Sequence, residues 1–181
     1  MKNKNMRDRM KIIIINGSAE SGKDQFVEYF KKNYKNKCFN LSTIDKVKKI
    51  TMKNFGWNGE KTEESRKFLS DVKKLWSDFN NGPFEDMIKQ IEKYQSKLGN
   101  KERKNAIYFI HCREPLEIQK FVDKYEKKCV TVLIKRIDII VPNNDSDKNV
   151  EDFNYTYTID NNDSKKILKE KAIQFIEELS N

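Results

Sequence analysis

The chain has 181 residues, enough for one domain to bury a continuous core without disulfides or a structural metal. Charged residues make up 36% of it and the formal net charge is +9, which predicts a heavily solvated surface that attracts anions. The lysines are spread along the whole chain and mixed with acids, a pattern that argues against nucleic acid as the main partner. Three scattered cysteines and one histidine match no zinc-ligand spacing.

The first apolar run of the chain is short. It comprises only Ile12 to Ile15 and follows a basic start, so it is too short for a signal-peptide core or a membrane span. We therefore expect a cytoplasmic protein with no membrane partner. The oligomeric state does not follow from the sequence.

Strands and helices alternate along the chain. Lys11 to Asn16 is a β-branched run of the kind found in strands buried on both faces, and apolar residues at helical spacing follow from Gly22 to Tyr34. This alternation predicts one α/β domain over residues 1–181, with a mostly parallel sheet of about five strands flanked by helices. The further expected elements are strands at 38–41, 106–112, 129–136 and 155–159 and helices at 42–55, 62–79, 83–98, 114–128 and 164–179.

The helix expected at 62–79 has a clear apolar stripe. Thr62 is suited to cap its start, and Pro83 is suited to open the helix that follows. The pattern predicts that one face of the helix is buried. The residues of that face are Phe68, Leu69, Val72, Leu75, Trp76 and Phe79.

A phosphate-binding loop lies between the first strand and the first helix. Gly17 and Gly22 are separated by four residues and Lys23 follows directly, the spacing of the G-x-x-x-x-G-K loop. Such a loop turns successive amide hydrogens toward phosphates, and its lysine reaches the β and γ oxygens. A chance turn before a lysine would lack the flanking strand and helix. We expect ATP to bind at Gly17, Ser18, Ala19, Glu20, Ser21, Gly22, Lys23 and Asp24 in a three-layer P-loop NTPase fold.

Asp24 stands where such loops usually offer a Ser or Thr hydroxyl to magnesium. A carboxylate there would hold Mg²⁺ directly or through water. The alternative role is a favourable negative charge in the first turn of the helix. We expect Asp24 to be the metal ligand.

The Gly-Lys-Asp ending of the loop resembles a branch of P-loop kinases that includes deoxynucleoside monophosphate kinases of phages and animal-type phosphomevalonate kinases. Residues 109–113 and 117–121 resemble that branch's strand ending in Asp-x-Arg and the helix after it. Residues 146–163 resemble the stretch from the lid to the adenine-binding turn. The resemblance implies an ATP- and Mg²⁺-dependent phosphotransferase, a short lid at about 137–150, and Asn161 at the nucleotide.

The chain departs from this branch at two places. His111 stands where the family usually has Asp, and the lid contains no arginine. A lone histidine at a strand end is either a hydrogen-bonded structural residue or a catalyst. We expect Lys23, Arg113 and Arg136 to be the catalytic cations, because Arg113 follows an apolar strand at the edge where parallel sheets bind ligands.

The acceptor is expected to bind to the helical part at about 43–99. Cations there would hold an acceptor phosphate, and Trp57 or Trp76 would stack on a base. The alternative is that these lysines are simply solvated and that Trp76 is part of the core. The candidate contacts are Ser42, Lys46, Lys49, Arg66 and Lys74.

Three classes of function are considered for these patterns: a small-molecule kinase, a regulatory NTPase and a nucleic-acid-binding module. A phosphate acceptor is already anionic and needs no general base, so we expect a kinase for a small phosphorylated molecule, foremost a nucleoside or deoxynucleoside monophosphate. Phosphomevalonate or another phosphorylated metabolite is the alternative substrate. A regulatory NTPase should show a Walker-B Asp and an Asn-Lys-x-Asp motif, which are not evident. A nucleic-acid-binding module would show salt-sensitive binding without turnover.

Overall fold

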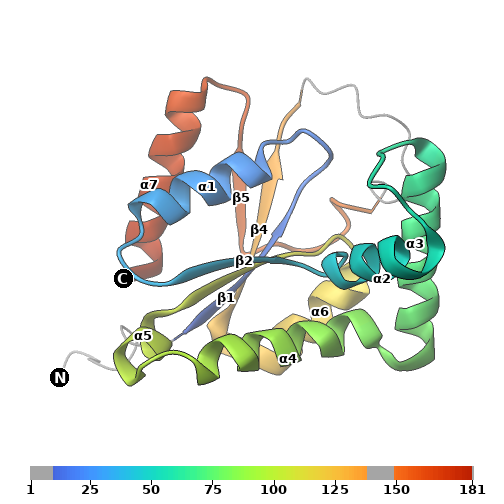
Figure 1. Cartoon of the computed structure of the whole chain (residues 1–181). Helices are drawn as coiled ribbons and strands as arrows, with labels where there is room; N and C mark the ends of the chain where they lie inside the picture. Colours follow the sequence, from blue (N-terminus) through green and yellow to red (C-terminus); the bar gives the residue numbers. More distant parts are fainter. Residues whose placement is uncertain (1–9, 138–148, 181) are drawn as a thin grey trace. The chain divides into compact units, whose positions relative to one another are not determined.

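The structure is a computed structural model that describes residues 10–137 and 149–180. Figure 1 shows its strands and helices. The chain forms two compact units, one of residues 1–40 and 98–181 and the other of residues 41–97. In chain order the elements are β1 (Lys11–Asn16), α1 (Lys23–Asn33), β2 (Cys38–Ser42), α2 (Asp45–Phe55), α3 (Glu63–Asn80), α4 (Gly82–Ser96), α5 (Asn100–Asn105), β3 (Ile107–His111), α6 (Pro115–Tyr125), the 3₁₀ helix η1 (Glu126–Lys128), β4 (Cys129–Lys135), β5 (Tyr157–Asp160) and α7 (Lys165–Ser180).

The five strands form one sheet in the order β2-β3-β1-β4-β5. The pairings of β1 with β3, of β1 with β4 and of β4 with β5 are all parallel. This confirms the predicted α/β class with a parallel sheet flanked by helices. The crossovers between these strands carry the helices, as parallel connections require.

The first strand lies in the middle of the sheet and is buried on both faces, as its β-branched run predicts. Ile12, Ile13, Ile14 and Ile15 have no exposed surface. Ile13 and Ile15 belong to the core that the sheet forms with α1 and α7, and the two helices lie side by side in Figure 1. The other members of that core are Phe26, Val27, Phe30, Ile107, Phe109, Val132, Ile134, Leu168, Ala172 and Phe175.

The register of the strands brings their carboxyl ends to one edge. Ile15 is paired with His111 of β3 and Asn16 with Leu133 of β4. In parallel sheets this edge is where ligands bind. The loop that follows β1 and the residues that follow β3 therefore lie side by side.

The buried face of α3 differs from the expected one. Leu75 and Phe79 are 70% and 83% exposed, whereas Leu69 and Lys73 are buried. Because each residue turns the helix by about 100°, a face centred on Leu69, Lys73 and Trp76 leaves Leu75 and Phe79 to one side. The face predicted from the apolar pattern is therefore rotated about the helix axis relative to the face that is buried.

Two further boundaries differ from the predictions. The helix expected at 114–128 ends at Tyr125, where Glu126 has a φ of +47° and a 3₁₀ turn follows. A six-residue helix, α5, occupies residues left without an element in the sequence analysis. In the ranges that the structure describes, no helix combines the length and the apolar character that crossing a bilayer requires.

Candidate active site

The loop between β1 and α1 has the backbone of a phosphate cradle. Gly22 has a φ of +93° and Glu20 a φ of +61°, so the chain reverses within a few residues. A Cβ atom on Gly22 would overlap the side-chain amide of Asn161. Glycine at this position is therefore required both by the left-handed backbone and by the neighbouring side chain.

Several polar groups of the loop have no partner among the described residues. The amide groups of Ser18, Glu20 and Gly22 donate to no described atom, and the hydroxyl of Ser21 is buried without a hydrogen bond to any of them. A buried hydroxyl without a partner, such as that of Ser21, is costly. Such donors fit a polyanion with many acceptor oxygens, and the loop thus suits the phosphates of a nucleotide.

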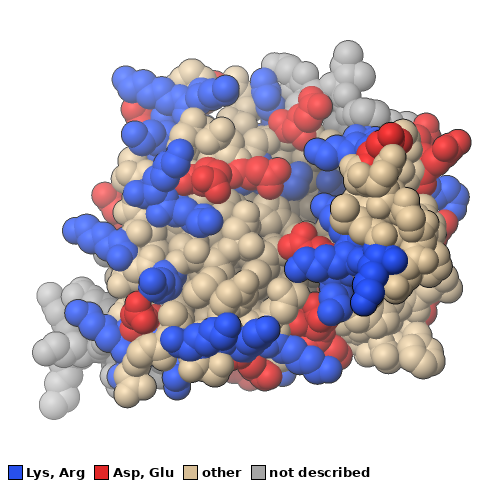
Figure 2. Space-filling view, viewed as in Figure 1, with Lys and Arg blue, Asp and Glu red and all other residues tan. Residues whose placement is uncertain are grey.

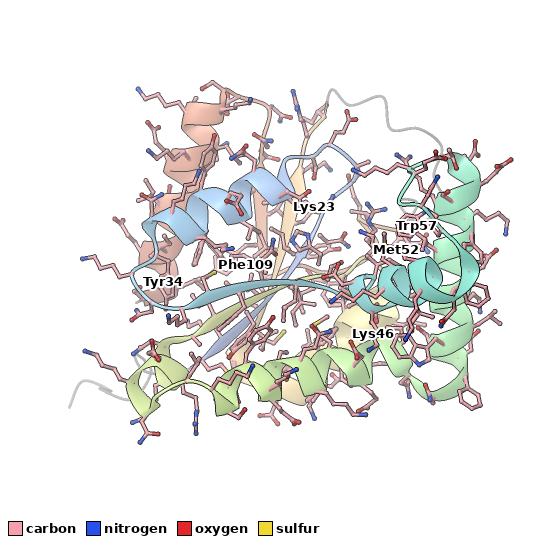
Figure 3. The ribbon with its side chains drawn as sticks, viewed as in Figure 1. Lys23, Tyr34, Lys46, Met52, Trp57 and Phe109 are labelled. Atoms are coloured by element: carbon pink, nitrogen blue, oxygen red, sulfur yellow. The ribbon has the colours of Figure 1, made fainter. Side chains whose placement is uncertain are left out.

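Lys23 is the first residue of α1 and lies beside the loop, as Figure 3 shows. Its Nζ atom donates to the carbonyl oxygen of Ser18 at 2.9 Å. The ammonium group thus lies over the loop, within reach of any phosphate held by the free amides. The catalytic role of Lys23 stays a prediction.

Asn16, the last residue of β1, holds the start of the loop through a hydrogen bond. The sequence did not predict this role. Its Oδ1 atom accepts from the amide of Gly17 at 2.8 Å. Its Nδ2 atom donates to the Tyr155 hydroxyl at 2.6 Å and to the Arg113 carbonyl at 3.2 Å. Asn16 is fully buried, and this side chain joins the loop to the end of β3 and to the segment before β5.

Tyr155 completes this network. Its hydroxyl donates to the carbonyl of Val150 at 2.7 Å, and burial is the main reason that its pKa rises to about 12. A protonated hydroxyl is what the network needs, because it accepts from Asn16 while it donates to Val150. The sequence gives no signal for its contact with Asn16, because the two residues lie 139 positions apart along the chain.

Asn161 contacts the phosphate loop through a hydrogen bond. Its Nδ2 atom donates to the carbonyl of Ser21 at 2.8 Å, and its backbone amide donates to the Lys135 carbonyl at 2.7 Å. The side chain is 9% exposed. Asn161 therefore fixes the shape of the loop, and its direct contact with the nucleotide stays a prediction.

Asp24 and His111 meet at the edge of the site. Oδ1 of Asp24 lies 3.7 Å from Nδ1 of His111, and Nε2 of His111 is 2.8 Å from Oδ1 of Asn40. The Asp24 side chain is 86% exposed and that of His111 only 15%. His111 thus has the fixed position of a hydrogen-bonded structural residue, while the Asp24 carboxylate is open to solvent and to an ion.

Within the described residues, potential metal ligands gather at Cys112, Glu114 and Glu117. The Cys112 thiol donates to Oε2 of Glu117 at 3.2 Å, so two of the three groups bind each other. Magnesium prefers oxygen ligands and retains several waters, and a thiol does not suit it. Asp24 with the phosphates of a bound nucleotide fits Mg²⁺ better.

The two predicted catalytic arginines occupy different environments. Arg113 is half-buried after β3, where Asn16 holds its carbonyl. Arg136 is exposed just after β4. Next to it, Nζ of Lys135 bonds the Glu151 carboxylate at 2.7 Å, which raises the pKa of Lys135. The expected lid at 137–150 falls mostly outside the described residues.

The predicted acceptor contacts lie at or beyond the end of β2 and are not all gathered in one place. Lys46 and Lys49 line a groove between α2 and α4. Arg66 is exposed on α3, and Lys74 pairs with Asp78 one turn along the same helix at 2.6 Å. The Ser42 amide donates to the Asp45 carboxylate at 3.1 Å. Of the five, only the two lysines of α2 line the groove.

The fold is similar to that of several solved structures. A gluconokinase from Sinorhizobium meliloti has a TM-score of 0.50 at 11% identity, over 94% of this chain and 93% of that one. A sugar kinase from Janibacter gives 0.50 at 7%, over 95% and 99%. A Thermus thermophilus protein gives 0.52 at 14%, over 96% and 100%. The chain thus has the fold of the gluconokinase and of the sugar kinase.

No protein-family model matches the chain, and no curated protein matches its sequence. The identities to the solved structures are low, so the likeness is one of fold.

Proposed function

We propose that this protein is an ATP-dependent kinase that transfers the γ-phosphate to a small phosphorylated acceptor, foremost a nucleoside or deoxynucleoside monophosphate. The observation that carries the proposal is the loop of residues 17–22, in which the amides of Ser18, Glu20 and Gly22 donate to no described atom and lie near the ammonium group of Lys23. Similarity in fold to a gluconokinase and a sugar kinase supports transfer to a small molecule. Cytoplasm remains the expected compartment.

Phosphoryl transfer depends on positioning and on neutralising the charge of the transferred group. In the proposed reaction the loop amides and Lys23 hold the β- and γ-phosphates. Asp24 would hold Mg²⁺ directly or through water, and Arg113 and Arg136 would neutralise charge on the transferred phosphoryl group. Bound ATP supplies the phosphoryl group, and Mg²⁺ would lower the charge on its oxygens.

The acceptor is proposed to be a phosphate rather than a hydroxyl. A hydroxyl acceptor usually needs a positioned carboxylate as general base, and the strand end where one is expected carries His111, held by Asn40. Ser42, Lys46, Lys49, Arg66 and Lys74 remain the proposed contacts for the acceptor. Phosphomevalonate and other phosphorylated metabolites are the alternative acceptors.

A coupled assay of ADP release tests the proposal. Purified full-length protein with ATP and Mg²⁺ is given nucleoside and deoxynucleoside monophosphates, phosphomevalonate and gluconate in turn. We expect one of the phosphorylated acceptors to stimulate ADP release. If gluconate alone stimulates it, the phosphate-acceptor proposal is wrong. If no acceptor does so although ATP binds, the proposed kinase activity is wrong.

Lys23→Ala provides the internal control for that assay. Loss of one group that stabilises the transition state costs about 100-fold or more in turnover, while the fold should persist. Lys32→Ala, an exposed lysine on the same helix, is the matched variant and should keep the wild-type rate. An unchanged rate in Lys23→Ala would show that the loop is not the active site.

A further inference from the structure

A groove in the unit of residues 41–97 has an unusual lining. It lies between α2 and α4, has a volume of about 450 Å³, and is lined by residues of those two helices and of the end of α4. Five of its eight residues are lysines. They are Lys46 and Lys49 from α2 and Lys89, Lys93 and Lys97 from α4 and its end, beside Asp86, Gln90 and Tyr94. Figure 2 shows lysine and arginine side chains along this face, and Figure 3 shows Lys46 between the two helices.

The five ammonium groups form no ion pair with any residue of 10–137 or 149–180. The single carboxylate of the groove, on Asp86, accepts a hydrogen bond from Gln90 at 2.6 Å instead. Elsewhere in the same unit, Lys67 and Lys74 each pair with an aspartate four residues later at 2.6 Å. The five groove lysines therefore concentrate positive charge, and Asp86 is the one acidic residue among the eight that line the groove.

The spacing of these lysines is costly for the helix. Lys89, Lys93 and Lys97 follow one another at intervals of four residues, which places like charges side by side and destabilises a helix. The helix dipole explains cations near the carboxyl end of α4, and this accounts for Lys93 and Lys97. It does not account for Lys89 in the middle of the helix, nor for the two lysines of α2 that face the same groove.

The size of the groove limits the ligand. Sites for small molecules have volumes of about 300 to 1,000 Å³, and this groove lies inside that range. A single phosphate carries about two negative charges at most and would satisfy only part of five lysines. We propose that the groove between α2 and α4 binds a small ligand that carries several adjacent phosphate groups.

The proposal overlaps with the proposed function in one respect, because Lys46 and Lys49 are also proposed acceptor contacts. The groove proposal rests on the proposed kinase function only through these two lysines. The test measures binding in the absence of ATP turnover, so its failure is distinguishable from failure of the kinase assay. The residues exchanged in it, Lys89, Lys93 and Lys97, have no part in the proposed reaction.

Isothermal titration calorimetry with inorganic tripolyphosphate tests the groove, without Mg²⁺ and at low salt. The phosphate loop is a second site for the same probe, so the full-length Lys23→Ala variant is titrated beside the wild type. We expect Lys23→Ala to retain binding at one site. Orthophosphate should bind that site at least about tenfold more weakly, because it engages fewer of the lysines.

A triple variant identifies the groove as that site. Lys89→Gln, Lys93→Gln and Lys97→Gln together, in the Lys23→Ala background, should weaken tripolyphosphate binding roughly tenfold or more. The control is Lys48→Gln, Lys53→Gln and Lys61→Gln, three exposed lysines of the same unit outside the groove. It removes the same charge and should leave binding within about twofold. Circular dichroism verifies that all variants are folded.

Three results would overturn the inference. Binding that disappears in Lys23→Ala would assign the phosphate loop as the only site. Equal weakening by the two triple variants would indicate a response to net charge. Binding of a single-stranded oligothymidylate more tightly than tripolyphosphate, with a steep salt dependence and loss in the groove variant, would assign the groove to a nucleic-acid strand.

Discussion

The Asp24 carboxylate at the start of α1 lies 3.7 Å from Nδ1 of His111 at the end of β3. The two residues follow or end neighbouring strands: Ile15 of β1 pairs directly with His111, and the loop after β1 leads to Asp24 in the first turn of α1. On its other side the imidazole is held by Asn40 at 2.8 Å. Asp24 is thus the solvent-facing member of this group, with its side chain 86% exposed.

Asp24→Asn should weaken the dependence of turnover on Mg²⁺. The amide keeps the size of the side chain but removes the negative charge that attracts the ion. We expect the Mg²⁺ concentration for half-maximal ADP release to rise about tenfold, a loss of about 1.4 kcal/mol. The measurement is a Mg²⁺ titration at saturating ATP. Glu28→Gln, an exposed change on the same helix, is the control, and equal titration curves for both variants would remove Asp24 from the metal site.

Gly22→Ala should disrupt the phosphate loop, and the chain provides a matched control. Gly22 and Gly59 have nearly the same φ, +93° and +94°, but a Cβ on Gly22 would overlap the amide of Asn161, while at Gly59 the space is open. Both variants incur the backbone cost of about 1 kcal/mol. We expect only Gly22→Ala to lose ATP binding, measured by calorimetry. Equal losses would show that the contact with Asn161 is unimportant.

Asn161→Ala should destabilise the fold and weaken nucleotide binding together. The change leaves the buried carbonyl of Ser21 without its partner, at a cost of about 1 to 3 kcal/mol. Urea denaturation measures the free energy of unfolding, and ATP titration measures the affinity. Asn33→Ala removes an exposed hydrogen bond within α1 and should cost less than about 0.5 kcal/mol. A stable variant with wild-type affinity would contradict the supporting role of Asn161.

The stability of the protein should fall in alkaline solution. Burial raises the pKa of Cys38 and of Cys129 from 9.0 to about 12, so the folded state keeps these thiol protons that the unfolded chain loses above pH 9. The stabilisation is complete below the unfolded value and is lost as the pH rises toward 12. We expect Tm to fall steadily above about pH 9.

A double variant, Cys38→Ala with Cys129→Ala, tests the cause of that fall. Each change also leaves a small void, so the comparison is between the slopes of Tm against pH and not between the Tm values themselves. The slope should be shallower in the double variant. An unchanged slope would assign the alkaline loss to other groups, of which Tyr108 and Tyr155 also have pKa values raised to about 12 by burial.

The corrected face of α3 gives a stability test. Phe79 is 83% exposed and Leu69 only 8%. Phe79→Ser should therefore change the free energy of unfolding by less than about 0.5 kcal/mol, while Leu69→Ala should cost about 2 to 4 kcal/mol. Urea denaturation of both variants measures the difference. A large loss in Phe79→Ser would restore the face expected from the apolar pattern.

The fold followed from local patterns. The isoleucines of β1, the G-x-x-x-x-G-K spacing and the Thr62 cap each act over a few residues, and each was placed correctly. The face of α3 was misplaced because Leu75 and Phe79 share the period of the true core residues. Composition within a helix does not tell which of two adjacent apolar stripes meets a partner.

The residues that hold the phosphate loop in place could not be predicted from local patterns. Asn16 and Tyr155 lie 139 residues apart and meet through one hydrogen bond. Neither residue type signals such a contact, because asparagine is mostly exposed in proteins and tyrosine occurs both at the surface and in the interior. The five-lysine groove was also hidden, since α2 and α4 contribute its lysines separately and only packing brings them together.

The hydrogen bond from Asn161 to Ser21 spans 140 residues of sequence. The side chain of Asn161, which is synthesised long after the loop, thereby completes the loop at residues 17–22. A nascent chain that has emerged only as far as the first strands would contain the whole G-x-x-x-x-G-K motif. It would still lack the Asn161 side chain that fixes the shape of the loop. Nucleotide binding should therefore require Asn161 to be in place, and a nucleotide present in the cell would stabilise only chains that have docked the segment after β5.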